Sequence, residues 1–118
     1  SSYFSTINAC MPTSPTVSAC NSCTMDSIDI TTSGAGAHAM ASDTITTSTT
    51  GGCATRTLVC DGTQANIEWN DGARGVTSDG DDGTVDGVAT QTLDCNDNGE
   101  WVIPPDDTVI TQAECASL

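Results

Sequence analysis

Apolar and polar residues alternate with a period of two along much of the chain. Residues 54–60 (ATRTLVC) put Leu58 and Cys60 on one face and threonines on the other. Residues 66–70 (NIEWN) alternate in the same way. Such alternation, interrupted by Gly, Asn and Asp, is typical of short antiparallel strands, and no segment keeps a helical period. The pattern predicts strands in residues 25–32, 43–50, 54–60, 66–70, 89–95, 100–103 and 108–115.

These strands place the chain in the all-β fold class. A length of 118 residues fits one domain, or one domain with an arm. A small antiparallel β-sandwich, similar in size to an immunoglobulin domain and stapled by disulfides, is the expected architecture. Residues 33–42 (SGAGAHAMAS) are small and predict a loop.

Residues 1–19 differ in composition from the rest of the chain. They are rich in Ser, Thr and Pro, carry no charge, and contain one apolar cluster, Tyr3, Phe4 and Ile7. A segment of this composition has no core of its own. We therefore expect an extended N-terminal arm over residues 1–19 and a β domain over residues 20–118. The arm would pack either on its own domain or on a neighbouring subunit, and in the second case the apolar cluster would anchor it.

The charge of the chain excludes several classes of partner. Sixteen acidic residues face two basic ones, Arg56 and Arg74, and the formal net charge is -14. Binding of nucleic acid requires clustered Lys and Arg, so a nucleic-acid partner is excluded. The longest apolar runs are far short of the roughly 20 residues that span a bilayer, so we expect no membrane insertion.

Seven cysteines in so short a chain indicate a disulfide framework formed in an oxidising compartment. The alternatives are a zinc site or a redox dithiol, because Cys20 and Cys23 form a C-x-x-C motif. No second pair stands at matching spacing, and the flanking residues show no helical period, so disulfides are favoured. The chain begins at Ser1 without a charged-then-apolar leader. We interpret this as a secreted, extracellular protein whose signal peptide has been removed.

Two segments that end in cysteine resemble each other. Residues 54–60 and 89–95 share five of seven residues. Their cysteines, Cys60 and Cys95, therefore end equivalent strands with equivalent facing, and both are expected to point inward. A Cys60–Cys95 bridge is the interpretation that this facing favours.

The sequence offers little equipment for catalysis, and we expect no enzyme. The single histidine, His38, lies in the expected loop and has no strained nucleophile motif around it. Most acidic residues fall in predicted turns or alternate outward on strands, whereas a glycosidase needs two carboxyl groups roughly 5–10 Å apart in a cleft.

The densest acidic stretch is residues 77–87, TSDGDDGTVDG. Clustered carboxylates with glycines favour calcium, and the candidate ligands are Asp79, Asp81, Asp82 and Asp86. The EF-hand template fails in both glycine registers, so a solvated hairpin loop is the favoured interpretation. We expect no cofactor, with calcium at this stretch as the alternative.

Serine and threonine offer sites for glycans. Together they make up 32 of 118 residues. We expect some O-glycosylation in the arm or in the threonine-rich segment, with the candidates Thr44, Thr46, Thr47, Ser48, Thr49 and Thr50. The alternative is that threonine simply suits exposed strand faces.

The segments CNSC, CATRTLVC, IEWN, TLDCNDNGEW and VITQAEC together resemble the nematode six-cysteine extracellular domain. The resemblance covers about residues 20–116. Its six cysteines fall on Cys20, Cys23, Cys53, Cys60, Cys95 and Cys115, and Cys10 lies outside that pattern. The family has no assigned biochemical function, so the resemblance implies an extracellular location and a disulfide framework.

The resemblance also implies a Cys20–Cys53 bridge. The other four family cysteines allow three pairings, of which we favour Cys60–Cys95 together with Cys23–Cys115. The odd cysteine, Cys10, is then a free thiol or a bond to another chain.

Two functions follow from these features. The first is a non-enzymatic subunit of an extracellular filament or matrix, in which copies of the chain assemble head-to-tail through the arm. The second is a monomeric recognition or adhesion module that binds a matrix, carbohydrate or cationic partner through its acidic loops.

Overall fold

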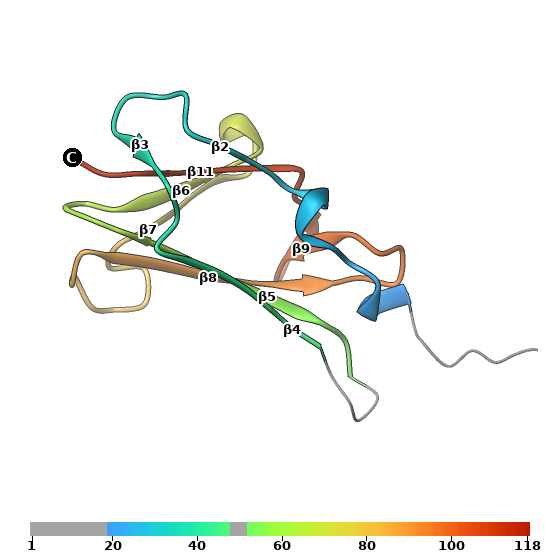
Figure 1. The fold of residues 1–118 in the computed structure, drawn as a ribbon. Helices are drawn as coiled ribbons and strands as arrows, with labels where there is room; N and C mark the ends of the chain where they lie inside the picture. Colours follow the sequence, from blue (N-terminus) through green and yellow to red (C-terminus); the bar gives the residue numbers. More distant parts are fainter. Residues whose placement is uncertain (1–18, 48–51) are drawn as a thin grey trace, which may run out of the picture.

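The predicted strands pack as two sheets, face to face, with the apolar side chains between them. The computed structural model describes residues 19–47 and 52–118. The expected arm over residues 1–19 therefore lies almost wholly outside the described residues. In Figure 1 the two sheets form an upper and a lower layer. The all-β, disulfide-stapled sandwich predicted from the sequence is confirmed.

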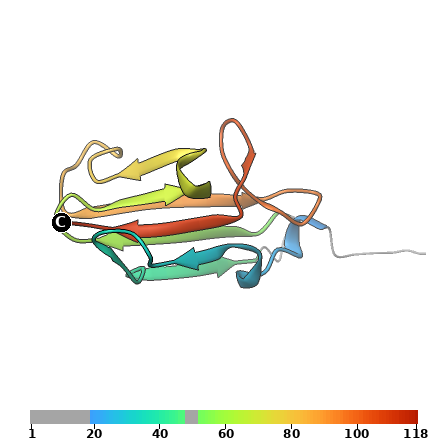
Figure 2. The ribbon, with the colours of Figure 1, turned by 90° about the horizontal axis from the view of Figure 1, so that it is seen from above.

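The first sheet has the strand order β10-β9-β8-β5-β4. Its strands are β4 (Ser42–Thr46), β5 (Thr55–Asp61), β8 (Val88–Cys95), β9 (Trp101–Ile103) and β10 (Thr108–Val109). All of its pairings are antiparallel. β5 and β8 form its longest ladder, and β4 lies at its outer edge, as Figure 2 also shows.

The second sheet has the order β2-β11-β6-β7, with β3 also paired to β11. Its strands are β2 (Asp29–Thr31), β3 (Ala37–His38), β6 (Asn66–Trp69), β7 (Gly75–Ser78) and β11 (Gln112–Ala116). The β2–β11 pair is parallel and the others are antiparallel. Three short 3₁₀ turns complete the described structure: η2 (Ala19–Asn21), η3 (Met25–Ser27) and η4 (Asn70–Gly72). No helix within the described residues is long and apolar enough to cross a membrane.

The sequence pattern missed two strands and joined two others. β3 lies in the segment expected to be a loop, and β7 lies in a segment for which no strand was expected. The expected strand over residues 108–115 is split between β10 and β11, which belong to different sheets. A chain that crosses between sheets keeps its β-branched composition, so composition alone does not show the crossing.

The core lies between the sheets and contains both tryptophans. Trp69 and Trp101 are almost completely buried. The indole Nε1 of Trp69 donates to Thr77 Oγ1 at 2.9 Å, and that hydroxyl donates to Gln91 Oε1 at 2.8 Å. This chain of hydrogen bonds runs from β6 through β7 in one sheet to β8 in the other, so the buried indole has a partner, as burial of a polar group requires.

The disulfide pairing differs from the expected one in two of three bridges. The structure joins Cys20 to Cys53, as the family resemblance implies, Cys23 to Cys95, and Cys60 to Cys115. The expected bridges Cys60–Cys95 and Cys23–Cys115 are therefore wrong.

The register of β5 and β8 explains the error. These strands are neighbours in one antiparallel ladder, and Cys60 lies opposite Ala89, six residues before Cys95. At about 3.4 Å per residue, the two cysteines lie roughly 20 Å apart along the ladder. Both side chains do point inward. They point inward at opposite ends of the sandwich, and each is bridged to the cysteine that lies at its own end.

Candidate interaction surface

β4 is an edge strand, and none of its outward-facing side chains is charged. It pairs with β5 along its whole length. Ser42, Thr44 and Thr46 are exposed, whereas Asp43 and Ile45 are partly buried. Edge strands commonly carry charges or prolines that prevent pairing with another chain. The charged residue of β4, Asp43, is turned inward instead.

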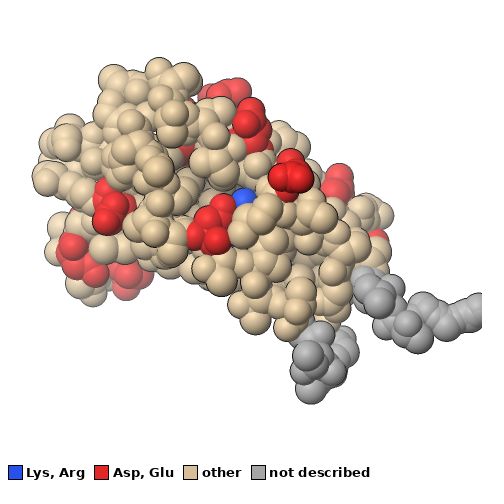
Figure 3. Space-filling model, viewed as in Figure 1, with Lys and Arg blue, Asp and Glu red and all other residues tan. Residues whose placement is uncertain are grey.

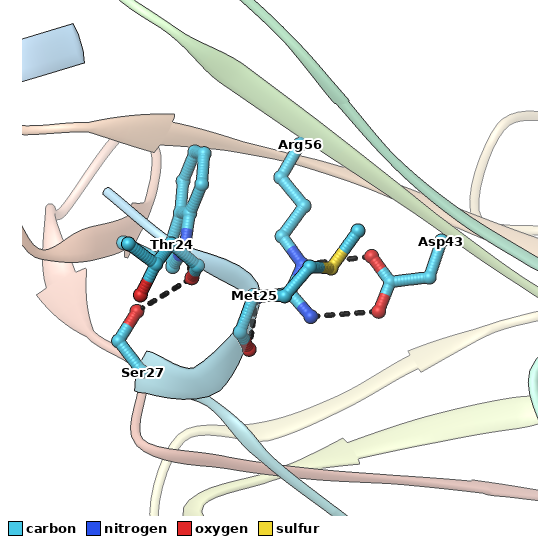
Figure 4. Close-up of polar contacts among 6 residues, drawn as sticks. Thr24, Met25, Ser27, Asp43 and Arg56 are labelled. Atoms are coloured by element: carbon cyan, nitrogen blue, oxygen red, sulfur yellow. Dashed lines mark hydrogen bonds and ion pairs between the residues drawn. The ribbon is translucent and has the colours of Figure 1, made fainter. Parts of the chain in front are cut away.

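Asp43 is held by the buried Arg56 of β5. Arg56 Nε and Nη2 donate to the two carboxylate oxygens of Asp43, each at 2.7 Å, as Figure 4 shows. Nη1 donates to the carbonyl of Met25 at 3.3 Å, and the guanidinium lies 5.8 Å from the centre of the Trp101 ring. Arg56 is 1% exposed. This bidentate pair neutralises the charge of β4 inside the sheet.

Sequence reasoning had not assigned Arg56 any role. The signal was available in the alternation, because Arg56 stands at the parity of Ala54, Leu58 and Cys60, all of which are buried. An arginine at an inward position needs a carboxylate. Asp43 occupies the inward parity of the neighbouring strand, diagonal to Arg56 in the β4–β5 ladder.

The outward face of β4, β5 and β8 carries a regular array of hydroxyl groups, which we call the threonine face. The hydroxyl groups belong to Ser42, Thr44, Thr46, Thr55, Thr57, Thr90 and Thr92, and Val59 completes the face without one. Register aligns them in rows, such as Thr44 opposite Thr57 and Thr57 opposite Thr92. The hydroxyl oxygens of Thr57 and Thr92 lie 3.2 Å apart. Asp61 and Asp94 lie at the ends of this face.

The outward face of the second sheet is acidic by contrast. Glu114 of β11 lies directly opposite Glu68 of β6. Both line a pocket of about 300 Å³, together with Gly34, Ala35, Asn66 and Ala116. Two like charges opposite each other in a ladder repel. The pocket is therefore a place where a positively charged group would be favoured.

The end of β2 and the loop after it hold the carboxylate of Glu114 by hydrogen bonds. Its Oε1 accepts from the Thr31 hydroxyl at 2.7 Å and from the Ser33 amide at 3.0 Å. Its Oε2 accepts from the Gly34 amide at 3.0 Å. The Thr31 hydroxyl, followed by the Ser33 amide, lowers the pKa of Glu114 below its ordinary value. These donors favour the ionised form, so Glu114 keeps its charge at mildly acidic pH.

The four calcium candidates lie in the loop between β7 and β8, where they accept backbone hydrogen bonds. Asp79 accepts from the amides of Asp86 and Gly87, at 3.0 and 2.9 Å. The other three also accept from amides close in sequence: Asp81 from Ser78, Asp82 from Thr84, and Asp86 from Val88. This is the hydrogen bonding of a polar turn. Calcium binding by Asp79, Asp81, Asp82 and Asp86 stays a prediction.

His38 lies beside a disulfide rather than on an isolated loop. It is part of β3 and is partly buried. Its Nε2 lies 3.0 Å from the Ser117 hydroxyl, and its Nδ1 lies 3.6 Å from Cys115 Sγ. Among the described residues, His38, Cys60 and Cys115 form the one close group of three candidate metal ligands. The two sulfurs are bonded to each other as a disulfide.

The other predicted site residues fall into two groups. All six family cysteines are paired within the domain. Cys10 and the proposed anchors Tyr3, Phe4 and Ile7 lie outside the described residues.

Positive charge is scarce on the described surface. Arg56 is buried, and Nε of Arg74 lies 3.2 Å from an Asp106 carboxylate oxygen. Figure 3 shows acidic side chains in several separate patches on a largely uncharged face, with very little basic surface.

Comparison with known proteins places the chain in a family. A model described as the C6 domain matches residues 8–115. The match begins upstream of Cys20, where we expected the domain to start, and it includes Cys10. The chain is 38% identical over 100 residues to an uncharacterised protein of Caenorhabditis elegans. The matched segment covers 83% of this chain and 65%, just under two thirds, of that relative. No solved structure matches. The resemblance to the six-cysteine domain is confirmed, and the chain belongs to the C6 domain family.

Proposed function

We propose that the chain is a non-enzymatic, secreted structural subunit of an extracellular assembly. Copies join head-to-tail when the N-terminal arm of one copy adds a strand to the sheet of the next. A small domain with three disulfides and no membrane-spanning helix among its described residues is consistent with an extracellular location.

The observation that carries the proposal is the uncharged edge of β4. β4 is the last strand of the first sheet, and β5 is its one neighbour in the strand order of the described residues. The backbone edge that faces away from β5 is a template for an added strand. The arm is itself uncharged, in a chain with a net charge of -14. An uncharged arm meets an uncharged edge without the repulsion that opposes other contacts between copies.

The domain also suits a structural role. Cys60–Cys115 joins β5 of the first sheet to β11 of the second, and both residues are fully buried. Cys20–Cys53 and Cys23–Cys95 tie the start of the described chain to the start of β5 and the end of β8. These bridges restrict the unfolded chain. They also fix the position of β5, the strand with which β4 pairs.

Removal of residues 1–18 tests the proposal. The full chain should form extended assemblies in electron micrographs, and the truncated chain should sediment as a monomer. Amides of β4 that exchange quickly in the truncated chain should become protected in the assembly. A variant that replaces Tyr3, Phe4 and Ile7 with serine keeps the arm length and should assemble poorly. Filaments from the truncated chain, or a monomeric full chain, would refute the proposal.

Salt offers a second readout of the same assembly. Copies of net charge -14 repel each other, and this repulsion is screened beyond about 8 Å at physiological ionic strength. Assembly should therefore strengthen as salt increases. Non-reducing electrophoresis of the assembled protein tests whether Cys10 bonds to another chain; a Cys10→Ser variant is the control.

The pocket at Glu68 and Glu114 favours a second candidate function, a monomeric module that recognises a cationic partner. A lysine-rich peptide should then bind more weakly as salt rises, and the Glu68→Gln variant should reduce binding. A full chain that stays monomeric and binds this peptide would favour recognition over assembly.

A further inference from the structure

We propose that the threonine face is an O-glycosylation site, with the hydroxyls of Thr44, Thr46, Thr90 and Thr92 as the acceptors. The first pair lies on β4 and the second on β8. The sequence favoured glycans in the arm or across residues 44–50, whereas the structure brings β8 onto the same face. This site is independent of the proposed assembly through the arm.

Exposure separates the four acceptors from the other threonines of the face. Thr44, Thr46, Thr90 and Thr92 are exposed, whereas the threonines of β5 between them are partly buried. β4 and β8 flank β5 on either side. Neighbouring strands lie about 4.8 Å apart, so the acceptors on β4 lie roughly 10 Å from those on β8. This distance leaves room for a sugar over each of the two strands.

The hydroxyls of three acceptors have no use within the folded protein. In the described part of the chain, those of Thr44, Thr46 and Thr90 make no hydrogen bond to a protein group. Thr92 shares one contact, with Thr57. By contrast, the Thr31 hydroxyl donates to Glu114, and the Thr77 hydroxyl donates to Gln91. The threonines of the face are therefore not explained by polar contacts that stabilise the fold.

The chemistry of the transfer is available to these residues. A transferase moves a sugar from a phosphate-activated donor to threonine Oγ1. The bond from the anomeric carbon to the donor phosphate breaks, the phosphate leaves with the electron pair, and the hydroxyl proton passes to a base. A strand holds the acceptor backbone extended, with side chains perpendicular to the sheet. Proteins that form disulfides pass through the oxidising secretory compartment, where such transferases act.

The position of the face also agrees with the edge of β4 as an assembly contact. Side chains leave a sheet at right angles to the direction in which strands pair. Sugars on Thr44 and Thr46 would cover the face and leave the backbone edge open. They would shield a sheet face that has acidic groups only at its ends, at Asp61 and Asp94.

Mass spectrometry of the intact full chain, secreted by C. elegans, tests the proposal. The protein should carry mass increments of whole sugar residues, and fragmentation by electron transfer should map them to the four acceptors. The Thr44→Val, Thr46→Val, Thr90→Val and Thr92→Val combination should lose these increments. Thr57→Val, on the same face but partly buried, and Thr84→Val, in an exposed loop, should keep the pattern.

Mapping on the unaltered chain needs no variant to fold, so it decides the proposal on its own. Secreted protein without sugar, or with sugar confined to the arm, residues 47–50 or loops outside the face, would overturn it. Sugar on at least one residue of β4 and one of β8 would support it.

Discussion

The two outward faces of the sandwich cover the same core but differ in where their acidic side chains point. On the first sheet, Asp43 is turned inward onto Arg56 and the face presents hydroxyl groups. On the second sheet, Glu114 points outward, lies opposite Glu68, and accepts hydrogen bonds from Thr31 at the end of β2 and from Ser33 in the loop after it. Strands of similar composition therefore give one face that is acidic only at its ends, at Asp61 and Asp94, and one face with two glutamates opposite each other.

Copies of this chain can approach each other more readily through the first sheet than through the second. Repulsion between acidic surfaces opposes contact through the second sheet. The first sheet offers an uncharged edge and a face whose acidic residues, Asp61 and Asp94, lie only at its ends. A buried ion pair removes the charge of Asp43 from the first sheet, and hydrogen bonds from Thr31, Ser33 and Gly34 hold Glu114 on the second. The Cys60–Cys115 disulfide joins the two sheets.

The largest effect is expected from removal of the Cys60–Cys115 bridge, which links the two sheets. A Cys60→Ala, Cys115→Ala variant opens a loop with a sequence separation of 55. By the entropy of loop closure, the free energy of unfolding should fall by about 4 kcal/mol. Both cysteines are fully buried, so the cavity left behind adds to this loss. Urea unfolding of the oxidised proteins measures it.

A Cys20→Ala, Cys53→Ala variant is the matched control. Its bridge has a separation of 33 and joins the start of the described chain to the start of β5. Cys53 is exposed, so the loss should be smaller and come mainly from chain entropy. A larger loss from this control would contradict the view that the inter-sheet bridge holds the two faces together.

The next largest effect concerns the ion pair that keeps β4 uncharged. Asp43→Ala removes the carboxylate partner of a guanidinium that is 1% exposed. An unpaired buried charge typically costs about 3–5 kcal/mol. We expect about 3 kcal/mol here, because the Asp43 side chain is 20% exposed and water can reach part of the site.

Arg56→Met removes the positive charge of the same ion pair. Methionine fills a similar volume, and Asp43 can turn toward water, so the loss of unfolding free energy should be well below that of Asp43→Ala. The released carboxylate would charge the β4 edge. Arg56→Met should therefore remain folded yet assemble less well than the unaltered chain. Equal losses of stability in the two variants would show that the charge of Arg56 is not what Asp43 compensates.

On the acidic face, the prediction is a dependence on pH. The Thr31 hydroxyl and the Ser33 amide hold the pKa of Glu114 below its ordinary value of 4.5. A lowered pKa in the folded state means that stability from this group is present above pH 4.5 and is lost as pH falls through the lower, folded pKa. Glu114→Gln should be less stable than the unaltered chain near neutral pH, and the difference should shrink below pH 4.5. Urea midpoints across this range measure it; a constant difference would contradict the assignment.

Parity along the strands could be read from the sequence, and it was correct. Alternation placed Leu58, Cys60 and Trp69 inside, and the family resemblance supplied the Cys20–Cys53 bridge. Parity fixes the face that a side chain occupies but not the end of the ladder at which it lies. Cys60 and Cys95 therefore shared a facing without sharing a bridge.

The candidate surface was less accessible to sequence reasoning because it depends on pairing. Thr44 and Thr92 are 48 residues apart in the chain, and the register on β5 brings them to one row. The partner of Glu114 across the ladder, Glu68, likewise follows from register rather than from spacing. A local pattern carries no information on which strands are neighbours.

The smallest effect is expected from the same substitution made on each face in protein produced without glycans. Thr57→Val keeps the β-branched shape that suits a strand and removes one hydroxyl contact with Thr92. A cross-strand contact of this kind is worth about 0.2–1 kcal/mol, and the loss should lie at the lower end because water replaces it.

Thr31→Val, on the second sheet, instead removes a donor to the ionised Glu114 and the acceptor of the Gln112 amide, at 2.7 Å each. It should cost more, and it should raise the pKa of Glu114 toward its ordinary value, as seen by carboxyl NMR. Equal effects would mean that the two faces do not differ in how their hydroxyls are used.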